Sequence, residues 1–98
     1  MTTLTLSHHV GDFDTWKPFY DQNGDSRREH GCTSAEVLTS ADDRNAITVV
    51  MTYPSIEQAQ AFLADSSLSE AMKNAGVEGP PEIRILESVE SLAYEGAS

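Results

Sequence analysis

The fold of this chain is decided in the stretch Ser7-His8-His9-Val10-Gly11-Asp12-Phe13-Asp14-Thr15-Trp16-Lys17. An alternating strand enters this stretch and ends at an aspartate that can cap a helix, and aromatic residues at helical spacing follow at once. From Leu4 to Val10 apolar and polar residues alternate, which predicts a half-buried strand with His8 on its apolar face. The sequence therefore places a histidine close to Trp16, the only tryptophan, where the strand gives way to the helix.

The helix after Asp12 is predicted to continue until Gly31 ends it. We expect Pro18 to distort or kink it, because proline removes a hydrogen bond to the carbonyl four residues earlier, and Gly24 weakens its middle. Aromatic and polar residues recur at helical spacing along one face of this helix: Phe13, Trp16, Phe19, Tyr20, Asn23 and Arg27.

The remaining elements follow from strand patterns and capping signals. Residues 32–40 and 46–53 read as a hairpin around the polar turn 41–45, and 47–51 reads as a central strand buried on both faces. Capping boxes at Ser55 and Ser67 predict two helices separated near residues 65–66, and Gly76 ends the second of them. A last strand is predicted over Glu82–Ser91.

The order βαββαβ predicts an α+β fold, a ferredoxin-like plait with a four-stranded antiparallel sheet and helices on one face. We expect one domain over residues 1–92 and a flexible tail over 93–98. Val49 with Met51, or Val50, is expected on the sheet face without helices. That face would be apolar, so we predict a homodimer that packs the two sheets together as a dimeric α/β barrel.

Composition narrows the possible partners. The 98 residues carry a net charge of −10, from 16 acidic and 6 basic side chains, which disfavours nucleic acid and membrane surfaces as partners. Cys32 is the lone cysteine, so no internal disulfide can form, and no apolar run reaches the length of a membrane span. Residues 1–3 lack the features of a signal peptide, and we expect a protein of the cytoplasm.

His8 is the candidate general base or acid. Partial burial beside the aromatic helix, with Asp12 as a nearby carboxylate, would tune its pKa, and the alternative is a structural histidine that hydrogen-bonds the helix start. His9 points to the opposite face of the strand, which argues against a metal site formed by the two histidines. The acidic pair Asp42 and Asp43 is typical of a solvated turn, so no metal is predicted there either.

Aromatic residues are the candidates for a ligand pocket between sheet and helices. Trp16, Phe19, Tyr53 and Phe62 would contact an aromatic substrate, and Tyr20 joins His8 and Asp12 as a catalytic candidate. The alternative for each aromatic residue is an ordinary place in the core.

Few other side chains offer chemistry. Arg27 and Arg84 are scarce positive charges that could hold a phenolate or carboxylate, unless nearby acids pair with them. His30 follows the helix end, where a cation interacts favourably with the helix dipole. Cys32 has no evident histidine and acid to activate it as a nucleophile.

Three segments carry a family resemblance: residues 8–17, the hairpin turn 41–45, and Ser67-Leu68-Ser69-Glu70-Ala71-Met72 running into residues 75–82. On these residues the chain resembles the dimeric α/β-barrel superfamily, which includes antibiotic-biosynthesis monooxygenases and some polyketide cyclases. The resemblance implies an enzyme without cofactor or metal that acts on a hydrophobic aromatic or polyketide-like molecule, as a monooxygenase or a cyclase. A non-enzymatic dimer that binds a small molecule or serves as an accessory protein is the alternative. The haem-degrading branch is disfavoured, because no histidine follows Phe62 as an axial ligand.

Overall fold

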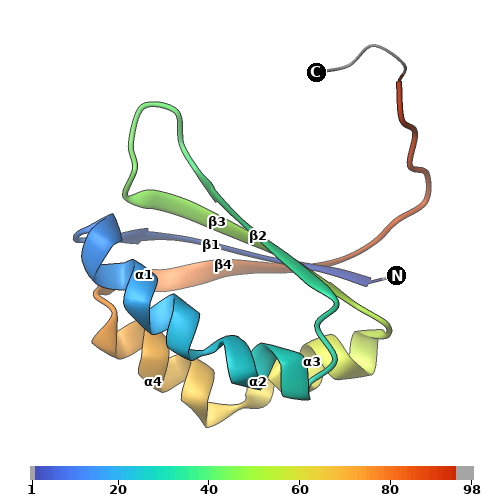
Figure 1. Ribbon diagram of the computed structural model, residues 1–98, viewed down its shortest axis with the longest axis horizontal. Helices are drawn as coiled ribbons and strands as arrows, with labels where there is room; N and C mark the ends of the chain where they lie inside the picture. Colours follow the sequence, from blue (N-terminus) through green and yellow to red (C-terminus); the bar gives the residue numbers. More distant parts are fainter. Residues whose placement is uncertain (1, 95–98) are drawn as a thin grey trace.

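A twisted antiparallel sheet carries all of the helices on one face (Figure 1). The structure is a computed structural model that describes residues 2–94, and its strands lie in the order β2-β3-β1-β4. This confirms the predicted ferredoxin-like plait. The elements are β1 (Thr2–Val10), α1 (Phe13–Gln22), α2 (Gly24–Glu29), β2 (Ser34–Thr39), β3 (Ala46–Tyr53), α3 (Ile56–Ala64), α4 (Ser66–Asn74) and β4 (Val77–Glu87).

The predicted first helix is two helices. Asp12 caps α1 as expected, because its carboxylate accepts the backbone N–H of Thr15 at 3.1 Å. The helix continues through Pro18 and breaks at Asn23 instead, and α2 starts at Gly24. A short polar residue followed by a glycine resists continuation of the helix more than the proline does here. Gly24 is buried, and a Cβ there would lie 3.3 Å from the guanidinium of Arg27.

The second half of the chain follows the prediction with two shifts. Helices α3 and α4 are separated as expected, but the cap of α4 is Asp65, which accepts the N–H of Ser67, rather than Ser67 itself. Strand β4 starts at Val77, five positions before the predicted Glu82, and ends at Glu87. Its prolines are tolerated because β4 is an edge strand, whose pairing with β1 is irregular between Ser7 and His9.

The core lies between the sheet and the helices. Strand β3 alternates strictly, with Ile47, Val49, Met51 and Tyr53 buried beneath the helices. As predicted, β3 is a central strand. Its other face is half-buried rather than buried, and of the two alternatives for the open face, Val49 with Met51 or Val50, the structure has the second. Val50 is the member of that set that faces away from the helices, and its strand neighbours on that face are Thr48 and Thr52. The open face is therefore richer in hydroxyl groups than expected.

Two further expectations concern the C-terminal tail and membrane-spanning helices. The tail predicted over 93–98 lies largely outside the described residues, which end at Tyr94, and its flexibility stays a prediction. Of the helices within residues 2–94, none combines the length and apolar character that crossing a bilayer requires.

Replacing Gly31 with alanine should destabilise the fold more than the same change at Gly76. Both glycines have positive φ, 92° and 83°, where an L-residue costs about 1–2 kcal/mol. At Gly31 the new methyl group would also meet the side-chain amide of Gln58, whereas at Gly76 it meets nothing within 4 Å. Gly11→Ala is the control, since that site has neither feature. Thermal unfolding of the three variants measures the order, and equal losses at Gly31 and Gly11 would contradict it.

Candidate functional site

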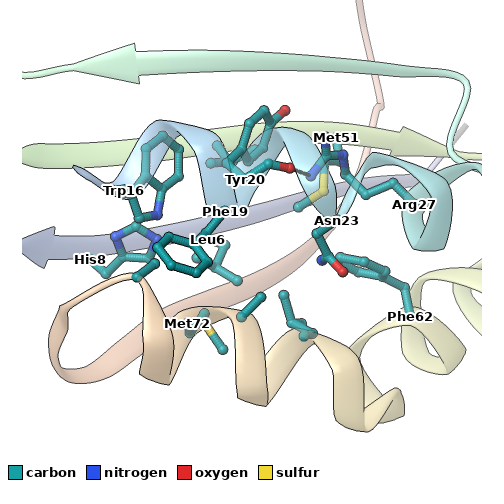
Figure 2. A pocket seen from close by; sticks show the side chains of 14 residues that line it. Leu6, His8, Trp16, Phe19, Tyr20, Asn23, Arg27, Met51, Phe62 and Met72 are labelled. Atoms are coloured by element: carbon teal, nitrogen blue, oxygen red, sulfur yellow. Dashed lines mark hydrogen bonds between the residues drawn. The ribbon is translucent and has the colours of Figure 1, made fainter. Parts of the chain in front are cut away.

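A small cavity of about 40 Å³ lies between the sheet and the helices. Its floor is formed by β1 and β3, one wall by α1 and α2, and the other by α3 and α4 (Figure 2). Apolar side chains make up most of the lining, and the polar members are His8, Tyr20, Asn23 and Arg27. This mixture of an apolar body with a few polar groups is typical of small-molecule sites.

His8 lies at one end of this cavity, on the helix-facing side of β1. Its Nδ1 atom is buried and has no hydrogen-bond partner within the described chain. The imidazole meets the Trp16 ring edge to face, with centroids 5.6 Å apart. Burial lowers the pKa of His8 from its ordinary 6.5, so the ring is neutral at pH 7. A neutral imidazole with an unused ring nitrogen can exchange a proton with a bound molecule.

Aromatic rings of α1 form the wall beside His8. Trp16 is 3% exposed and stacks on Tyr20, with centroids 5.1 Å apart, and its other neighbour along the helix is Phe13 at 5.7 Å. Phe19 joins Trp16 in the lining. The helical spacing found in the sequence thus brings Trp16, Phe19 and Tyr20 to the cavity.

Arg27 lies toward the other end of the cavity (Figure 2). Its guanidinium stacks 3.8 Å from the centroid of the Tyr20 ring, and Nη1 donates to the Tyr20 carbonyl at 2.9 Å. Burial raises the pKa of the Tyr20 hydroxyl and outweighs the opposite effect of Arg27, so this phenol stays protonated. Arg84, the other arginine considered, is instead paired with Glu82 at 3.2 Å on the surface.

Two of the residues predicted for the site, Asp12 and Tyr53, lie outside the cavity lining, and Tyr20 lines it with its hydroxyl turned away from His8 (Figure 2). The carboxylate of Asp12 bonds the backbone and hydroxyl of Thr15, and the pKa of His8 is shifted by burial rather than by this acid. Tyr53 is fully buried, lies outside the cavity lining, and directs its hydroxyl at the sulfur of Met51, 3.8 Å away. The Tyr20 hydroxyl points away from His8 (Figure 2), and the Trp16 ring lies between them. Phe62 lines the cavity as predicted.

Residues that the sequence does not mark as site candidates complete the cavity. Asn23 projects into it from the break between α1 and α2, and its position on the stripe of Trp16, Tyr20 and Arg27 was the available signal. The opposite wall comes from Leu68, Ala71 and Met72 of α4 and from Ala75, which caps the end of that helix. These read as an ordinary apolar helix face, because nothing in the sequence indicates which part of that face meets a cavity.

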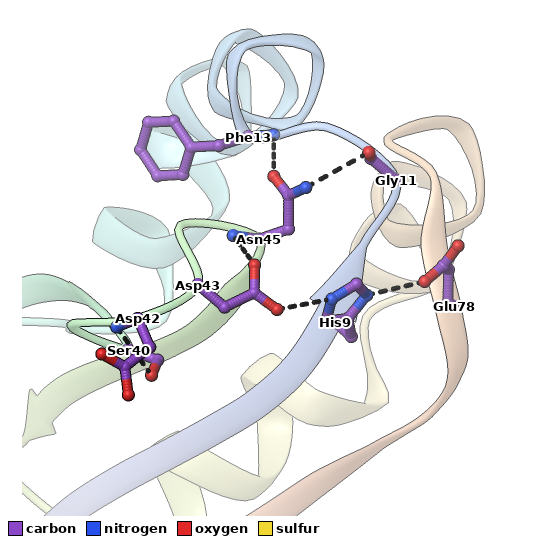
Figure 3. Close-up of polar contacts among 8 residues, drawn as sticks. All are labelled: His9, Gly11, Phe13, Ser40, Asp42, Asp43, Asn45 and Glu78. Carbon is purple, nitrogen blue, oxygen red and sulfur yellow. Dashed lines mark hydrogen bonds and ion pairs between the residues drawn. The ribbon is translucent and has the colours of Figure 1, made fainter.

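Two polar clusters lie away from this cavity. At the end of α2, the His30 ring lies 2.9 Å from the Asp65 carboxylate, and this contact ties α2 to the junction of α3 and α4. Hydrogen bonds from His30, Ser67 and Ser26 hold the pKa of Asp65 well below its usual range. His9 lies between Glu78 at 2.6 Å and Asp43 at 3.0 Å (Figure 3). Within residues 2–94, no group of three or more histidine, cysteine or acidic side chains is arranged to hold a metal ion.

The His9 cluster should stabilise the fold in a pH-dependent way. Glu78 and Asp43 raise the pKa of His9 above 6.5, so its stabilising effect is complete below pH 6.5 and is lost as the pH rises through the raised value. We expect the melting temperature of His9→Gln to fall below that of the unsubstituted protein near pH 5.5 and to approach it near pH 9. A difference that does not change with pH would contradict this role.

Comparisons with known proteins establish the fold. No family model matches the sequence, and no curated protein matches it. SnoaB, a cofactor-independent oxygenase from Streptomyces nogalater, is similar in structure with a TM-score of 0.76 at 11% identity, covering 95% of this chain and 96% of that chain. An antibiotic biosynthesis monooxygenase has a TM-score of 0.74 at 13% sequence identity, and the match covers 92% of this chain and 100% of that chain. Rv0793 from Mycobacterium tuberculosis has a TM-score of 0.69 at 14% sequence identity, and the match covers 95% of this chain and 100% of that chain. The chain thus has the ferredoxin-like fold of these proteins.

Proposed function

We propose that this protein is an enzyme without cofactor that oxygenates a hydrophobic aromatic or polyketide-like molecule held between its sheet and its helices. The observation that carries the proposal is the buried, unpartnered Nδ1 of His8 beside an aromatic wall. Burying a polar atom without a partner is unfavourable, and a ligand that shares a proton with His8 removes that cost. The oxygenase named among the similar structures supports oxygen chemistry over ring closure.

In this mechanism His8 takes the proton of a phenol or of a carbon beside a carbonyl. The resulting electron-rich anion gives electrons to dioxygen, a carbon–oxygen bond forms, and His8 returns its proton to the peroxide oxygen. Loss of water from the hydroperoxide leaves a ketone or quinone, so that one oxygen atom stays in the product and the other leaves as water. Trp16 and Phe19 keep bulk water away from the anion. Cyclisation of a polyketide-like substrate would begin with the same proton transfer.

A non-enzymatic role in binding a small molecule is the second candidate. The observation that favours it is the cavity volume of about 40 Å³, well below the roughly 300–1,000 Å³ of pockets that enclose drug-sized ligands. An aromatic substrate therefore requires side chains of the lining to move. Met72 is suited to this, because its unbranched side chain adapts its shape readily.

The setting that we propose for this activity is a cytoplasmic homodimer joined through the open face of the sheet, with residues 1–92 as the folded unit. Exposed apolar side chains among the hydroxyl groups of that face support the dimer: Leu38 beside Thr48 and Leu86 beside Thr3 are 44% and 43% exposed. A hydrophobic small molecule is the proposed partner. A net charge of −10 supports the exclusion of nucleic acid and anionic membranes.

Anthrone and 2-naphthol test the proposal. Calorimetry with 2-naphthol should show binding, and an oxygen electrode should show uptake of one dioxygen per anthraquinone formed from anthrone, faster than in protein-free buffer. Binding without uptake would favour the non-enzymatic role. Neither binding nor uptake would overturn the proposal.

A further inference from the structure

Arg27 is a positive charge without a carboxylate partner in an acidic protein. The other three arginines each lie within 4.0 Å of an acid: Arg28 beside Asp25, Arg44 beside Asp14 and Arg84 beside Glu82. Within residues 2–94 no such acid accompanies Arg27, although the chain has 16 acidic side chains. A guanidinium left unpaired at the lining of an apolar cavity is available to an anion that enters it.

The local structure holds this guanidinium in place. It stacks on the Tyr20 ring and donates one hydrogen bond, from Nη1 to the Tyr20 carbonyl. A guanidinium has about five N–H donors, so most of them remain for a ligand. The absence of a side chain at buried Gly24 makes room for Nη2, and Asn23 projects an amide into the same part of the cavity (Figure 2).

A row of aromatic rings joins the two polar ends of the cavity and indicates the shape of the ligand. His8 and Arg27 are linked by successive ring contacts, 5.6 Å to Trp16, 5.1 Å to Tyr20 and 3.8 Å to the guanidinium. A flat aromatic molecule can lie along that row and reach both ends once side chains of the lining move, because the cavity itself is about 40 Å³. The walls between the ends are apolar, so only the two ends of the ligand can be polar.

We infer that the ligand is an aromatic carboxylate, whose carboxylate is bound by Arg27 with Asn23 and whose far end carries the group that gives its proton to His8. This inference rests on the proposed function, because it assumes that the cavity is the substrate site. It adds the substrate class: an elongated organic acid in place of a neutral aromatic molecule. A carboxylate suits this end because it is ionised at neutral pH and matches the planar fork of the guanidinium.

The test uses two probes of nearly the same shape, 6-hydroxy-2-naphthoate and its neutral carboxamide, 6-hydroxy-2-naphthamide, in calorimetric titrations at pH 7. We expect the carboxylate to bind about tenfold or more tightly than the amide, the equivalent of roughly 1.4 kcal/mol. Arg27→Gln should abolish this preference, because the affinity for the carboxylate falls to about that for the amide. Arg84→Gln, the matched control, should leave both affinities unchanged, and Arg27→Lys should retain part of the preference.

The possible outcomes separate the inference from the proposed function. If both probes bind equally to the unsubstituted protein, the carboxylate anchor is wrong and the cavity remains a binding site. If neither binds, the proposed function and the anchor fall together. Melting curves confirm that each variant is folded, and if Arg27→Gln is unfolded, the salt dependence of binding to the unsubstituted protein decides. The affinity for the naphthoate should fall with added salt while that for the amide does not, and equal salt dependence would overturn the anchor.

Discussion

His8→Ala should lower turnover by about two to four orders of magnitude, the usual range for loss of a general acid or base. The structure supplies an unusually clean test, because the Nδ1 atom of His8 has no partner that the substitution would leave unsatisfied. The fold loses the packing of the ring, including its contact with Trp16, and no hydrogen bond of Nδ1. His9→Ala is the matched control, since the adjacent imidazole lies on the other face of β1, where it bonds Asp43 and Glu78.

The pH dependence of kcat/KM tests whether His8 is the group that accepts the proton. Burial lowers the pKa of His8 below 6.5, so the rate should fall on the acid side with a midpoint below pH 6.5. That acid limb should vanish in His8→Ala and persist in His9→Ala. An unchanged rate for His8→Ala on a confirmed substrate would remove His8 from the mechanism, and Arg27 would become the first group to examine.

Val49→Lys and Val50→Lys should act on different properties although the two residues are adjacent: the first on folding of the chain, the second on association. Val49 is 3% exposed beneath the helices, and an unpaired charge there should destabilise the chain by about 3–5 kcal/mol. The stability of a 98-residue domain is about 5–15 kcal/mol, so this variant should be largely unfolded at elevated temperature.

Val50 lies on the open face, opposite Thr5 on one neighbouring strand and Glu36 on the other. A lysine there can pair with Glu36 in the monomer, so the chain should fold. In the dimer the same charge would be enclosed between two sheets. We expect light scattering to show weaker association, and the melting temperature to fall and lose its dependence on protein concentration. A monomeric mass for the unsubstituted protein at micromolar concentration would contradict the dimer.

The parts of the fold that the sequence predicts well have local causes. The hairpin, the cap at Asp12 and the break before α4 each depend on residues that are close in the chain. The sequence leaves the orientation of β3 open between two alternatives, because Val49-Val50-Met51 contains no polar residue to mark a face. Thr48 and Thr52 flank that run at the parity of Val50 and carry the signal that would have placed it. Strand β4 begins earlier than predicted because its prolines are typical of a connection, and only pairing with β1 shows that an edge strand accepts them.

The residues of the candidate site likewise fall into those that local patterns predict and those that depend on packing between elements. Strand alternation and helical spacing bring His8, Trp16 and Arg27 toward one another, and both are properties of single elements. The wall from α4 depends on how that helix packs across the sheet against α1, which no local pattern determines. The position of the Tyr20 hydroxyl, turned away from His8, likewise follows from a side-chain rotamer that the sequence does not show.

Asn45, in the turn between β2 and β3, restricts how this loop can be redesigned. Its side chain accepts the N–H of Phe13 at 2.8 Å and its carbonyl accepts that of Val10 at 2.9 Å, while Asp43 reaches His9 (Figure 3). The start of the helix that bears Trp16 is thus attached to a loop about 30 positions later in the chain. Epitope or affinity tags inserted between Ala41 and Asp42, both exposed, should leave the scaffold intact. Loop grafts that replace residues 43–45 would instead detach the helix start, so libraries built on this scaffold should keep Asp43 and Asn45 constant.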